Sequence, residues 1–307
     1  MTSVAILANP ANADAGRLAA SAADWLISRG HQARTLLVGE PARAGEKGLA
    51  TASDASDLGG IDVALSIGGD GTFLRLVSLA YPTDVPILGV NFGRLGYLLH
   101  VQPADLEEAL AAAVSVDLRI EERTVLAVRV DGDLTVAPSG DEFALTDQGT
   151  KANGASGRWW LALNELVAEK TVPGHTVSLA TAVDREPFLV YVADGVLVAT
   201  ATGSTAYNLS AGGPALAPGL GSVVLTPIAP HLGFDRSVVL QGDQEVSITV
   251  LESRPAILVV DGREVGRVDP GGTISCRAAR RPVRFVAFGK QGFAGRLRTA
   301  LADGRGR

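Results

Sequence analysis

The sequence predicts an α/β N-terminal domain with a mostly parallel, doubly wound sheet, followed by an all-β, sandwich-like C-terminal domain. Over the first third of the chain, apolar runs of strand length alternate with segments of helical periodicity, which is typical of doubly wound sheets. From about residue 121, short β-rich runs separated by Gly, Asp and Pro turns replace this alternation. The 307 residues suffice for about two domains. We expect the domains at residues 1–120 and 121–285, with a segment 286–307 that packs back on the first.

Hydrophobic periodicity gives the elements of the N-terminal domain in order. Apolar residues at helical spacing predict a helix from about residue 18 to Gly30, and a second helix over residues 72–80. Pro103 opens a third helix over residues 104–114, whose acidic first turn favours the helix dipole. The strands expected here are residues 4–8, 35–38, 61–67 and 86–91.

The C-terminal domain is expected to be built from short strands joined by turns. Three Asp-Gly pairs, beginning at Asp131, Asp194 and Asp261, are typical of tight turns. We expect one helical interruption after Gly203, a mobile polar loop at residues 138–157, a closing helix at 293–301 and a frayed tail at 302–307. The strands expected here are residues 125–130, 161–167, 177–183, 188–192, 196–200, 223–225, 246–251, 257–260 and 273–276.

Composition excludes several function classes. The net charge is −6 and the isoelectric point about 5.3, whereas proteins that bind nucleic acid or anionic membranes need a basic face. Cys276 is the single cysteine, so no intrachain disulfide can form. We see no apolar run near the ~20 residues of a membrane span and no signal-peptide pattern. We therefore expect a cytoplasmic protein without nucleic-acid or membrane partners.

The first candidate site is the run Gly68-Gly69-Asp70-Gly71-Thr72, which follows an apolar strand and precedes a helix. Ligands bind at this edge of open α/β sheets, and glycines with helix N-terminal amides suit phosphate groups. The alternative is a tight turn that happens to carry Asp70. Leu74 occupies the place of the third glycine of the dinucleotide fingerprint, and no Walker A sequence occurs. Phosphoryl transfer would therefore need a different phosphate cradle.

The second candidate is the pair Asn164-Glu165, which interrupts an apolar run at residues 159–167. Adjacent strand residues point to opposite faces, so at least one of the two should face inward or line a cleft. A buried carboxylate is costly unless it is paired or coordinates a ligand. The alternative is an edge strand on which both groups are solvated.

The third candidate is the segment 202–214, which gathers hydroxyls, small residues and glycines between two apolar runs. Ser204 is predicted to cap a short helix whose polar groups face a ligand. An ordinary capped connection is the alternative. Ser204 is not in a Gly-x-Ser-x-Gly nucleophile elbow, and the four histidines show no metal-ligand spacing.

Taken in order, these segments resemble the NAD kinase family. Residues 68–74 match its signature loop, residues 91–98 match the segment after its next strand, and Asn164-Glu165 matches its paired polar residues. Asp194-Gly195 with residues 202–214 matches its longest motif, which is the most specific because other kinases carry similar Gly-rich loops. Order and spacing hold from about residue 4 to beyond Asp261.

The resemblance implies ATP- and Mg²⁺-dependent phosphorylation of the 2′-hydroxyl of the adenosine ribose of NAD, giving NADP. It implies Asp70 as general base, Mg²⁺ held mainly by ATP, and a homodimer or homotetramer in which a neighbouring subunit can complete the site. The residues that it places against the substrates are Gly68, Gly69, Gly71, Thr72, Phe73, Arg75, Asn91, Asn164, Glu165, His175, Asp194, Thr205, Ala206, Tyr207, Ser210 and Arg263.

Three positions depart from the family pattern. Ala201 replaces a common proline, Val192 stands where a basic residue is frequent, and Arg263 replaces a frequent glutamine. A kinase of another nucleoside hydroxyl therefore stays open. Two further alternatives are a lipid kinase that shares the loop and a non-catalytic dinucleotide sensor that kept the pocket. The absence of a basic amphipathic helix disfavours the lipid kinase, and the retained Asp70 disfavours the sensor.

Overall fold

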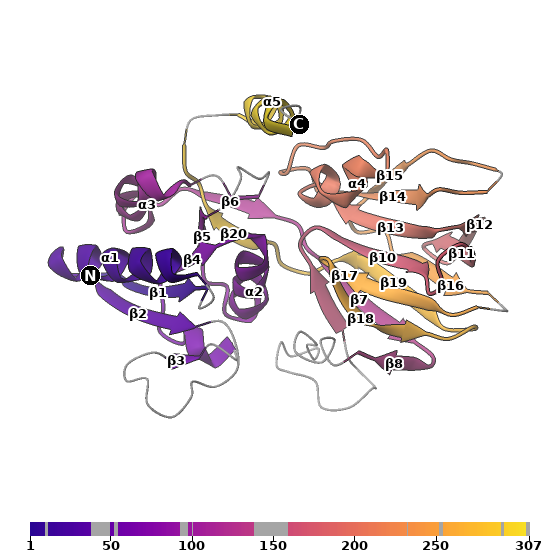
Figure 1. The fold of residues 1–307 in the computed structure, drawn as a ribbon, viewed down its shortest axis with the longest axis horizontal. Helices are drawn as coiled ribbons and strands as arrows, with labels where there is room; N and C mark the ends of the chain where they lie inside the picture. Colours follow the sequence, from indigo (N-terminus) through magenta and orange to yellow (C-terminus); the bar gives the residue numbers. More distant parts are fainter. Residues whose placement is uncertain are drawn as a thin grey trace. The chain divides into compact units, whose positions relative to one another are not determined.

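The computed structural model divides the chain into two compact units (Figure 1). Unit 1 comprises Met1–Glu122 and Val283–Arg307, and unit 2 comprises Arg123–Pro282. The structure describes residues 1–9, 12–37, 50–51, 55–92, 98–99, 101–137, 159–231, 233–251, 254–289 and 292–304. The loop expected at residues 138–157, and residues 93–97 of the family motif, lie outside this part of the chain. No helix among the described residues is long and apolar enough to cross a membrane.

Unit 1 is built on a sheet with the strand order β3-β2-β1-β4-β5-β20-β6. The pairings from β3 through β20 are parallel. The last part of the chain returns to this sheet, because Phe285 of β20 pairs with Ile87 of β5, and the yellow β20 lies among purple strands in Figure 1. The strand bounds are β1 Ser3–Ala8, β2 Gln32–Leu37, β3 Ala50–Thr51, β4 Val63–Gly68, β5 Ile87–Asn91, β6 Ile120–Arg123 and β20 Val283–Val286.

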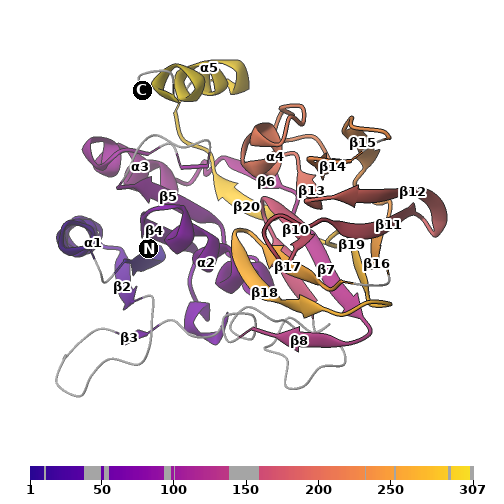
Figure 2. The same ribbon diagram turned by 45° about the vertical axis from the view of Figure 1, so that its right-hand side comes forward.

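Helices cover both faces of this sheet, which confirms the doubly wound prediction. Residues of α1 and α3 pack in one core cluster with alternate residues of β1, β4 and β5. On the opposite face of β5, a Cβ added at Gly89 would lie 2.7 Å from the ring of Phe73 in α2. Figure 2 shows the helices of unit 1 around the sheet. The bounds are α1 Ala13–Ser28, α2 Asp70–Ala80, α3 Leu106–Ala113 and α5 Phe293–Gly304, with 3₁₀ turns η1 Ala55–Leu58, η2 Tyr81–Thr83 and η3 Pro103–Asp105.

Local signals explain where these helices begin and end. The side-chain oxygen of Asn12 accepts hydrogen bonds from the N–H groups of Asp14 and Ala15 at 2.9 and 3.2 Å, which caps α1. Gly30, with φ of +80°, follows the end of α1. The predicted second helix begins earlier than expected, at Asp70, because Gly69 takes the capping position.

Unit 2 is a sandwich of two antiparallel sheets, as the sequence predicts. The strand orders are β15-β14-β13-β10-β17-β18-β8 and β12-β11-β16-β19-β7-β9. Side chains from both sheets, with Trp160 among the largest, form one buried core. The helical interruption consists of η5 Gly203–Thr205 and α4 Tyr207–Ser210. The strand bounds are β7 Leu126–Asp131, β8 Leu134–Val136, β9 Trp159–Ala162, β10 Glu165–Lys170, β11 Val177–Val183, β12 Glu186–Ala193, β13 Gly195–Thr200, β14 Ser222–Ile228, β15 Val238–Gln241, β16 Val246–Val250, β17 Ala256–Val260, β18 Arg263–Val268 and β19 Thr273–Ala278.

The single strand expected at residues 161–167 is wrong. The chain bends at Leu163 and Asn164, so that β9 belongs to one sheet and β10 to the other. Pattern could not show the bend because apolar residues continue on both sides of it. The edge-strand alternative for Asn164-Glu165 is also wrong, because β10 lies between β13 and β17.

The three Asp-Gly pairs form two kinds of connection. Asp261-Gly262 joins the paired strands β17 and β18, with φ of +48° and +74°, as a tight hairpin turn requires. Asp131-Gly132 and Asp194-Gly195 instead carry the chain from one sheet to the other. Glycine is needed at position 195 because a Cβ there would lie 2.6 Å from the carbonyl oxygen of Ala168.

Candidate active site

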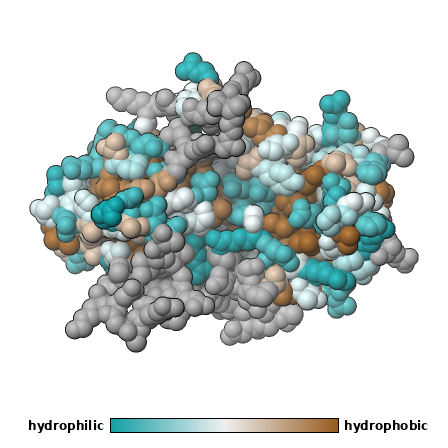
Figure 3. All heavy atoms as spheres, viewed as in Figure 1, coloured by the Kyte–Doolittle hydropathy of each residue, from teal (hydrophilic) through white to brown (hydrophobic). Residues whose placement is uncertain are grey.

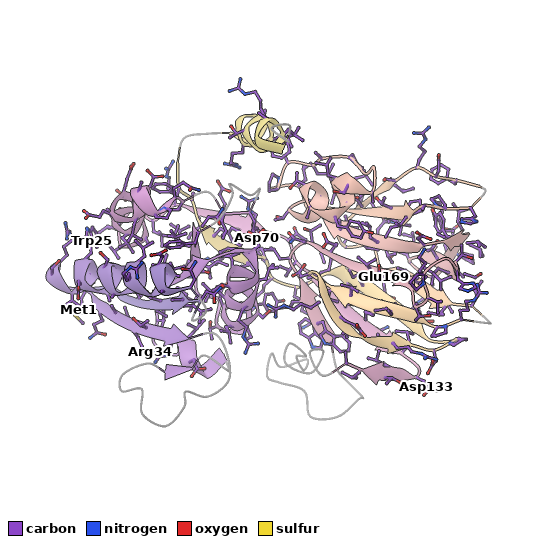
Figure 4. The ribbon with its side chains drawn as sticks, in the orientation of Figure 1. Met1, Trp25, Arg34, Asp70, Asp133 and Glu169 are labelled. Atoms are coloured by element: carbon purple, nitrogen blue, oxygen red, sulfur yellow. The ribbon has the colours of Figure 1, made fainter. Side chains whose placement is uncertain are left out.

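The Gly-Gly-Asp-Gly run forms the junction between β4 and α2. Gly68 ends the strand, Gly69 caps the helix with its backbone, and Asp70 is the first helical residue. Figure 4 labels Asp70 on unit 1. Asp70 is exposed by area, and desolvation raises the pKa of its carboxyl above the ordinary 3.8. The partial positive charge of the helix N-terminus favours the ionised form that a base requires.

Two glycines of this run are not required by the packing of unit 1. A Cβ at Gly68 would lie 2.7 Å from Oγ1 of Thr72, so that glycine has a structural reason. A Cβ at Gly69 or Gly71 would meet nothing within 4 Å, and neither residue has a positive φ. Glycine inside a helix costs about 1 kcal/mol relative to alanine, and the space around Gly71 gives no steric reason for it.

The other candidates of unit 1 lie deeper than the Gly-Asp-Gly junction. Phe73 packs edge-to-face against Phe285, with 5.2 Å between ring centroids, so it is a core residue. Thr72, Arg75 and Asn91 are buried. The structure thus places Asp70, Gly69 and Gly71 at the surface of unit 1. Ligand contacts of the buried residues Thr72, Phe73, Arg75 and Asn91 stay predictions.

In unit 2, the bend at residues 163–165 is held by the carboxylate of Asp261. One oxygen accepts the N–H of Leu163 at 2.8 Å, and the other accepts the N–H groups of Asn164 and Glu165 at 2.7 and 3.2 Å. The Asp261 N–H donates in return to the carbonyl oxygen of Glu165 at 2.9 Å. Sequence reasoning missed this role because it read Asp261-Gly262 only as a turn.

The same bend explains why position 203 of the long motif is glycine. The Oγ1 of Thr200 donates to the carbonyl oxygen of Leu163 at 2.6 Å and accepts the Gly203 N–H at 2.9 Å. A Cβ at Gly203 would lie 2.0 Å from the carbonyl oxygen of Asn164. The start of η5 therefore packs directly on the bend that carries Asn164 and Glu165.

Glu165 is a buried carboxyl that the fold does not fully satisfy. It is 6% exposed, and its Oε2 has no hydrogen-bond partner among the described residues. Burial, followed by the nearby charge of Asp261, raises its pKa to about 8, while a bond from the Tyr207 backbone N–H acts in the opposite direction. Since buried polar atoms are nearly always paired in folded proteins, the unpaired oxygen makes Glu165 a candidate for contact with a ligand.

The predicted cap by Ser204 is wrong. Its Oγ donates to the carbonyl oxygen of Ala201 at 2.7 Å and accepts the Leu216 N–H at 2.8 Å, so it ties the loop to the return segment. Asn208 fills the space beside Gly213, where a Cβ would lie 2.1 Å from its Oδ1. These hydroxyl and amide groups shape the loop and leave the Tyr207 side chain exposed.

Tyr207 lies among acidic side chains. Burial and then the charges of Glu169, Asp194 and Glu165 raise the pKa of its phenol. The Nζ of Lys170 lies 2.6 Å from Oδ1 of Asp194. Figure 4 labels Glu169, which follows Glu165 by four residues on β10 and so shares its face of the strand. The group offers several hydrogen-bond acceptors of the kind that ribose hydroxyls need.

The remaining candidates have mixed environments. His175 and Ser210 are exposed, Ala206 is half-buried, and Thr205 is buried with its Oγ1 3.3 Å from the carbonyl oxygen of Thr202. The charge of Arg263 acts on Asp261 and lowers its pKa. Within the described ranges, no group of three or more His, Cys, Asp or Glu side chains is arranged to hold a metal ion.

Comparison with known proteins identifies the family. The family model described as "ATP-NAD kinase N-terminal domain" matches residues 4–118, and the one described as "ATP-NAD kinase C-terminal domain" matches residues 163–288. NAD kinase 1 of Streptomyces avermitilis is 36% identical over an alignment covering 99% of this chain and 91% of that protein. NAD kinase of Heliobacterium modesticaldum is 34% identical, with 99% and 100% covered.

Solved structures agree with this result. An NAD kinase from Archaeoglobus fulgidus in complex with ATP superposes with a TM-score of 0.68 at 25% identity, covering 99% of each chain. Yeast NADH kinase complexed with NADH superposes with a TM-score of 0.78 at 20% identity, covering 100% of this chain and 89% of that one, which shows a shared fold. The chain belongs to the ATP-NAD kinase family, whose members phosphorylate NAD.

Proposed function

We propose that this chain transfers the terminal phosphoryl group of ATP to the 2′-hydroxyl of the adenosine ribose of NAD, giving NADP. Family membership supports the reaction class. The observation that carries the proposal is Asp70 at the first position of α2, flanked by Gly69 and Gly71 with open Cβ positions. A carboxylate at a helix N-terminus, between two glycines that add no side chain, combines a base with a place for phosphate oxygens.

In this proposal Asp70 removes the proton from the ribose hydroxyl as the bond to phosphorus forms. Ribose hydroxyls are poor nucleophiles at pH 7, so a base within hydrogen-bond reach accelerates the step. Positioning and neutralisation of the triphosphate charge supply the rest. Mg²⁺ usually keeps several waters and binds largely through substrate phosphates. ATP would therefore supply most of its ligands, and the described residues hold no group of three or more metal-ligating side chains. When bound, Mg²⁺ would offset negative charge on the phosphates.

Unit 2 binds the dinucleotide in this proposal. The buried Glu165 offers an unpaired oxygen to a ribose hydroxyl, and Asn164 projects from the same bend. Tyr207 and Asp194 offer further polar contacts beside them. These groups suit ribose hydroxyls rather than phosphates, because negative or neutral side chains accept hydrogen bonds and do not attract an anion.

An acceptor panel tests the proposed reaction. The protein is incubated with ATP and Mg²⁺ and with NAD, NADH or a set of nucleosides, and phosphorylated products are identified by mass spectrometry. We expect product from NAD or NADH. Product from another nucleoside alone would reveal a different acceptor, and NAD binding without turnover would indicate a sensor.

The open glycine provides the first mutational prediction. Gly71→Ala is expected to leave stability unchanged or raise it by up to about 1 kcal/mol, because alanine favours helix. The new methyl group occupies the space that we assign to the ligand, so kcat/KM should fall at least about tenfold. Steady-state kinetics and a thermal melt measure the two effects. Gly16→Ala in α1, where a Cβ also meets nothing within 4 Å, is the matched control and should keep wild-type activity.

We also propose that the protein assembles as a homodimer or homotetramer. Phe188, Val190 and Val192 alternate on β12, the edge strand of its sheet, and all three are exposed, Val190 to 61%. Figure 3 shows one face of the molecule, on which apolar and hydrophilic residues alternate over both units. An exposed apolar edge strand is a natural surface for association with a second copy.

Sedimentation velocity measures this assembly. We expect wild-type protein to sediment above the monomer mass and Val190→Lys to shift it toward the monomer. Val116→Lys, at a fully exposed position of unit 1, should change nothing. A monomeric wild type, or an unchanged mass in Val190→Lys, would contradict the assembly through β12.

A further inference from the structure

We propose that Asp261 is a positioning residue of the dinucleotide site, which fixes the bend that carries Asn164 and Glu165. The inference rests on the proposed function and deepens it, because it adds a residue that sequence reasoning left as a turn. Asp261 does not itself need to touch NAD. It acts through the backbone of residues 163–165 and through its charge.

The geometry of the contact is that of a clamp. The Asp261 carboxylate accepts three successive backbone N–H groups at 2.7–3.2 Å, and its own N–H donates to the Glu165 carbonyl oxygen at 2.9 Å. Both carboxylate oxygens are used. Three donors on two oxygens favour the ionised carboxylate, and hydrogen bonds to a charged acceptor are the stronger kind. An asparagine at this position could accept at one oxygen only.

The turn between β17 and β18 fixes the backbone of Asp261 and so positions its carboxylate. Asp261 has φ of +48° in the connection between β17 and β18, and β17 pairs with β10 along the length of that strand. The clamp therefore joins the start of β10 to a neighbouring hairpin of the same sheet. Asn164 and Glu165 cannot move without breaking it.

The clamp also places a negative charge beside Glu165. The negative charge of Asp261 raises the pKa of Glu165, and the positive charge of Arg263 in β18 lowers the pKa of Asp261. Burial raises the pKa of Asp261 to about 6, and burial with the Asp261 charge raises that of Glu165 to about 8. The charge of Asp261 therefore adds to burial in opposing the ionisation of Glu165.

Asp184 is a similar carboxylate that supports a loop away from the candidate site, so it provides a comparison with a purely structural contact. Asp184 also has a positive φ, +50°, in the turn between β11 and β12. Its two oxygens accept the Glu245 N–H at 2.9 Å and the Gln244 side-chain amide at 3.1 Å. The loop that Asp184 holds carries no candidate site residue. Asp184→Asn is therefore the matched control for Asp261→Asn.

Two properties of the full chain are measured: the titration of Glu165 without ligand, and the steady-state kinetics. Carbon-13 NMR follows the titration of the Glu165 side-chain carboxyl, assigned by its loss in Glu165→Gln. Steady-state kinetics give kcat and the KM for NAD and for ATP. In Asp261→Asn we expect the Glu165 inflection to fall by at least about one pH unit and the KM for NAD to rise about tenfold or more. The KM for ATP should change less than about threefold.

Asp184→Asn should lower the melting temperature without moving the inflection or the KM for NAD. If Asp261→Asn fails to fold, Asp261→Ser provides the same loss of charge, with the same expected shift. An unshifted inflection together with an unchanged KM for NAD would overturn the role of Asp261. A shifted inflection in a protein that never phosphorylates NAD would count against the proposed function alone.

Discussion

Asp70→Asn is expected to lower kcat for NAD phosphorylation by about 10²–10⁴-fold, while the affinity for NAD changes only a few-fold. Removal of a general base typically has this cost. Asparagine is nearly isosteric with aspartate and keeps a polar group at the first position of α2, so the fold should survive. Quench-flow or steady-state kinetics with a binding titration separate the two quantities.

The matched control is Asp14→Asn. Asp14 also lies in the first turn of a helix, α1, so its replacement removes the same interaction with a helix N-terminus, worth about 0.3–1 kcal/mol. It should leave kcat at the wild-type value. Wild-type turnover in Asp70→Asn would reduce Asp70 to a turn residue and remove the base from the proposed mechanism.

Glu165→Gln is expected to weaken NAD binding by about 1.5–3 kcal/mol, which is the usual loss for a hydrogen bond that involves a charged group. ATP affinity should change much less, because the phosphate cradle is assigned to the Gly-rich run of unit 1. Isothermal titration with each nucleotide measures both effects. Glu186→Gln, at an exposed position of β12, should leave both affinities unchanged.

The same variant has a predicted dependence of stability on pH. The pKa of Glu165 rises from 4.5 to about 8 on folding, so the folded state binds the proton more tightly than the unfolded state. The free energy of unfolding of the wild type should therefore fall as the pH rises from about 4.5 to about 8. Glu165→Gln removes this dependence. The difference in melting temperature between the variant and the wild type should therefore shift in favour of the variant as the pH rises from about 4.5 to about 8. Unchanged NAD affinity, with an effect on melting alone, would make Glu165 a structural residue.

Much of the fold was predictable because its signals are local. The alternation of strands and helices in unit 1, the short β runs of unit 2 and the helical interruption after Gly203 all follow from hydrophobic period and turn residues. The strand β20 was missed because its four residues, Val283–Val286, pair with a sheet nearly 200 residues earlier in sequence (Ile87 to Phe285). A short apolar run carries no information about so distant a partner.

The candidate site residues could be chosen from the sequence by residue type, but the contacts that hold them in place could not. The sequence singles out Asp70 and the pair Asn164-Glu165, because a polar residue in an apolar or Gly-rich context is locally visible. It could not show that Glu165 follows a bend between two sheets, or that Asp261, 96 residues away, holds that bend. It also assigned Ser204 to a cap, whereas long-range bonds to Leu216 decide its role. Such contacts depend on tertiary packing that periodicity does not encode.

Identification of the product formed from ATP, Mg²⁺ and NAD decides whether the 2′-hydroxyl is the acceptor. A dehydrogenase that is specific for NADP reports the 2′-phosphate, and 2′-deoxy-NAD, which lacks the accepting hydroxyl, serves as the matched substrate. We expect NADP from NAD, no phosphorylated product from 2′-deoxy-NAD, and loss of NADP formation in Asp70→Asn. Folded protein that binds ATP and NAD and forms no NADP, or that phosphorylates 2′-deoxy-NAD equally well, would contradict the proposed function.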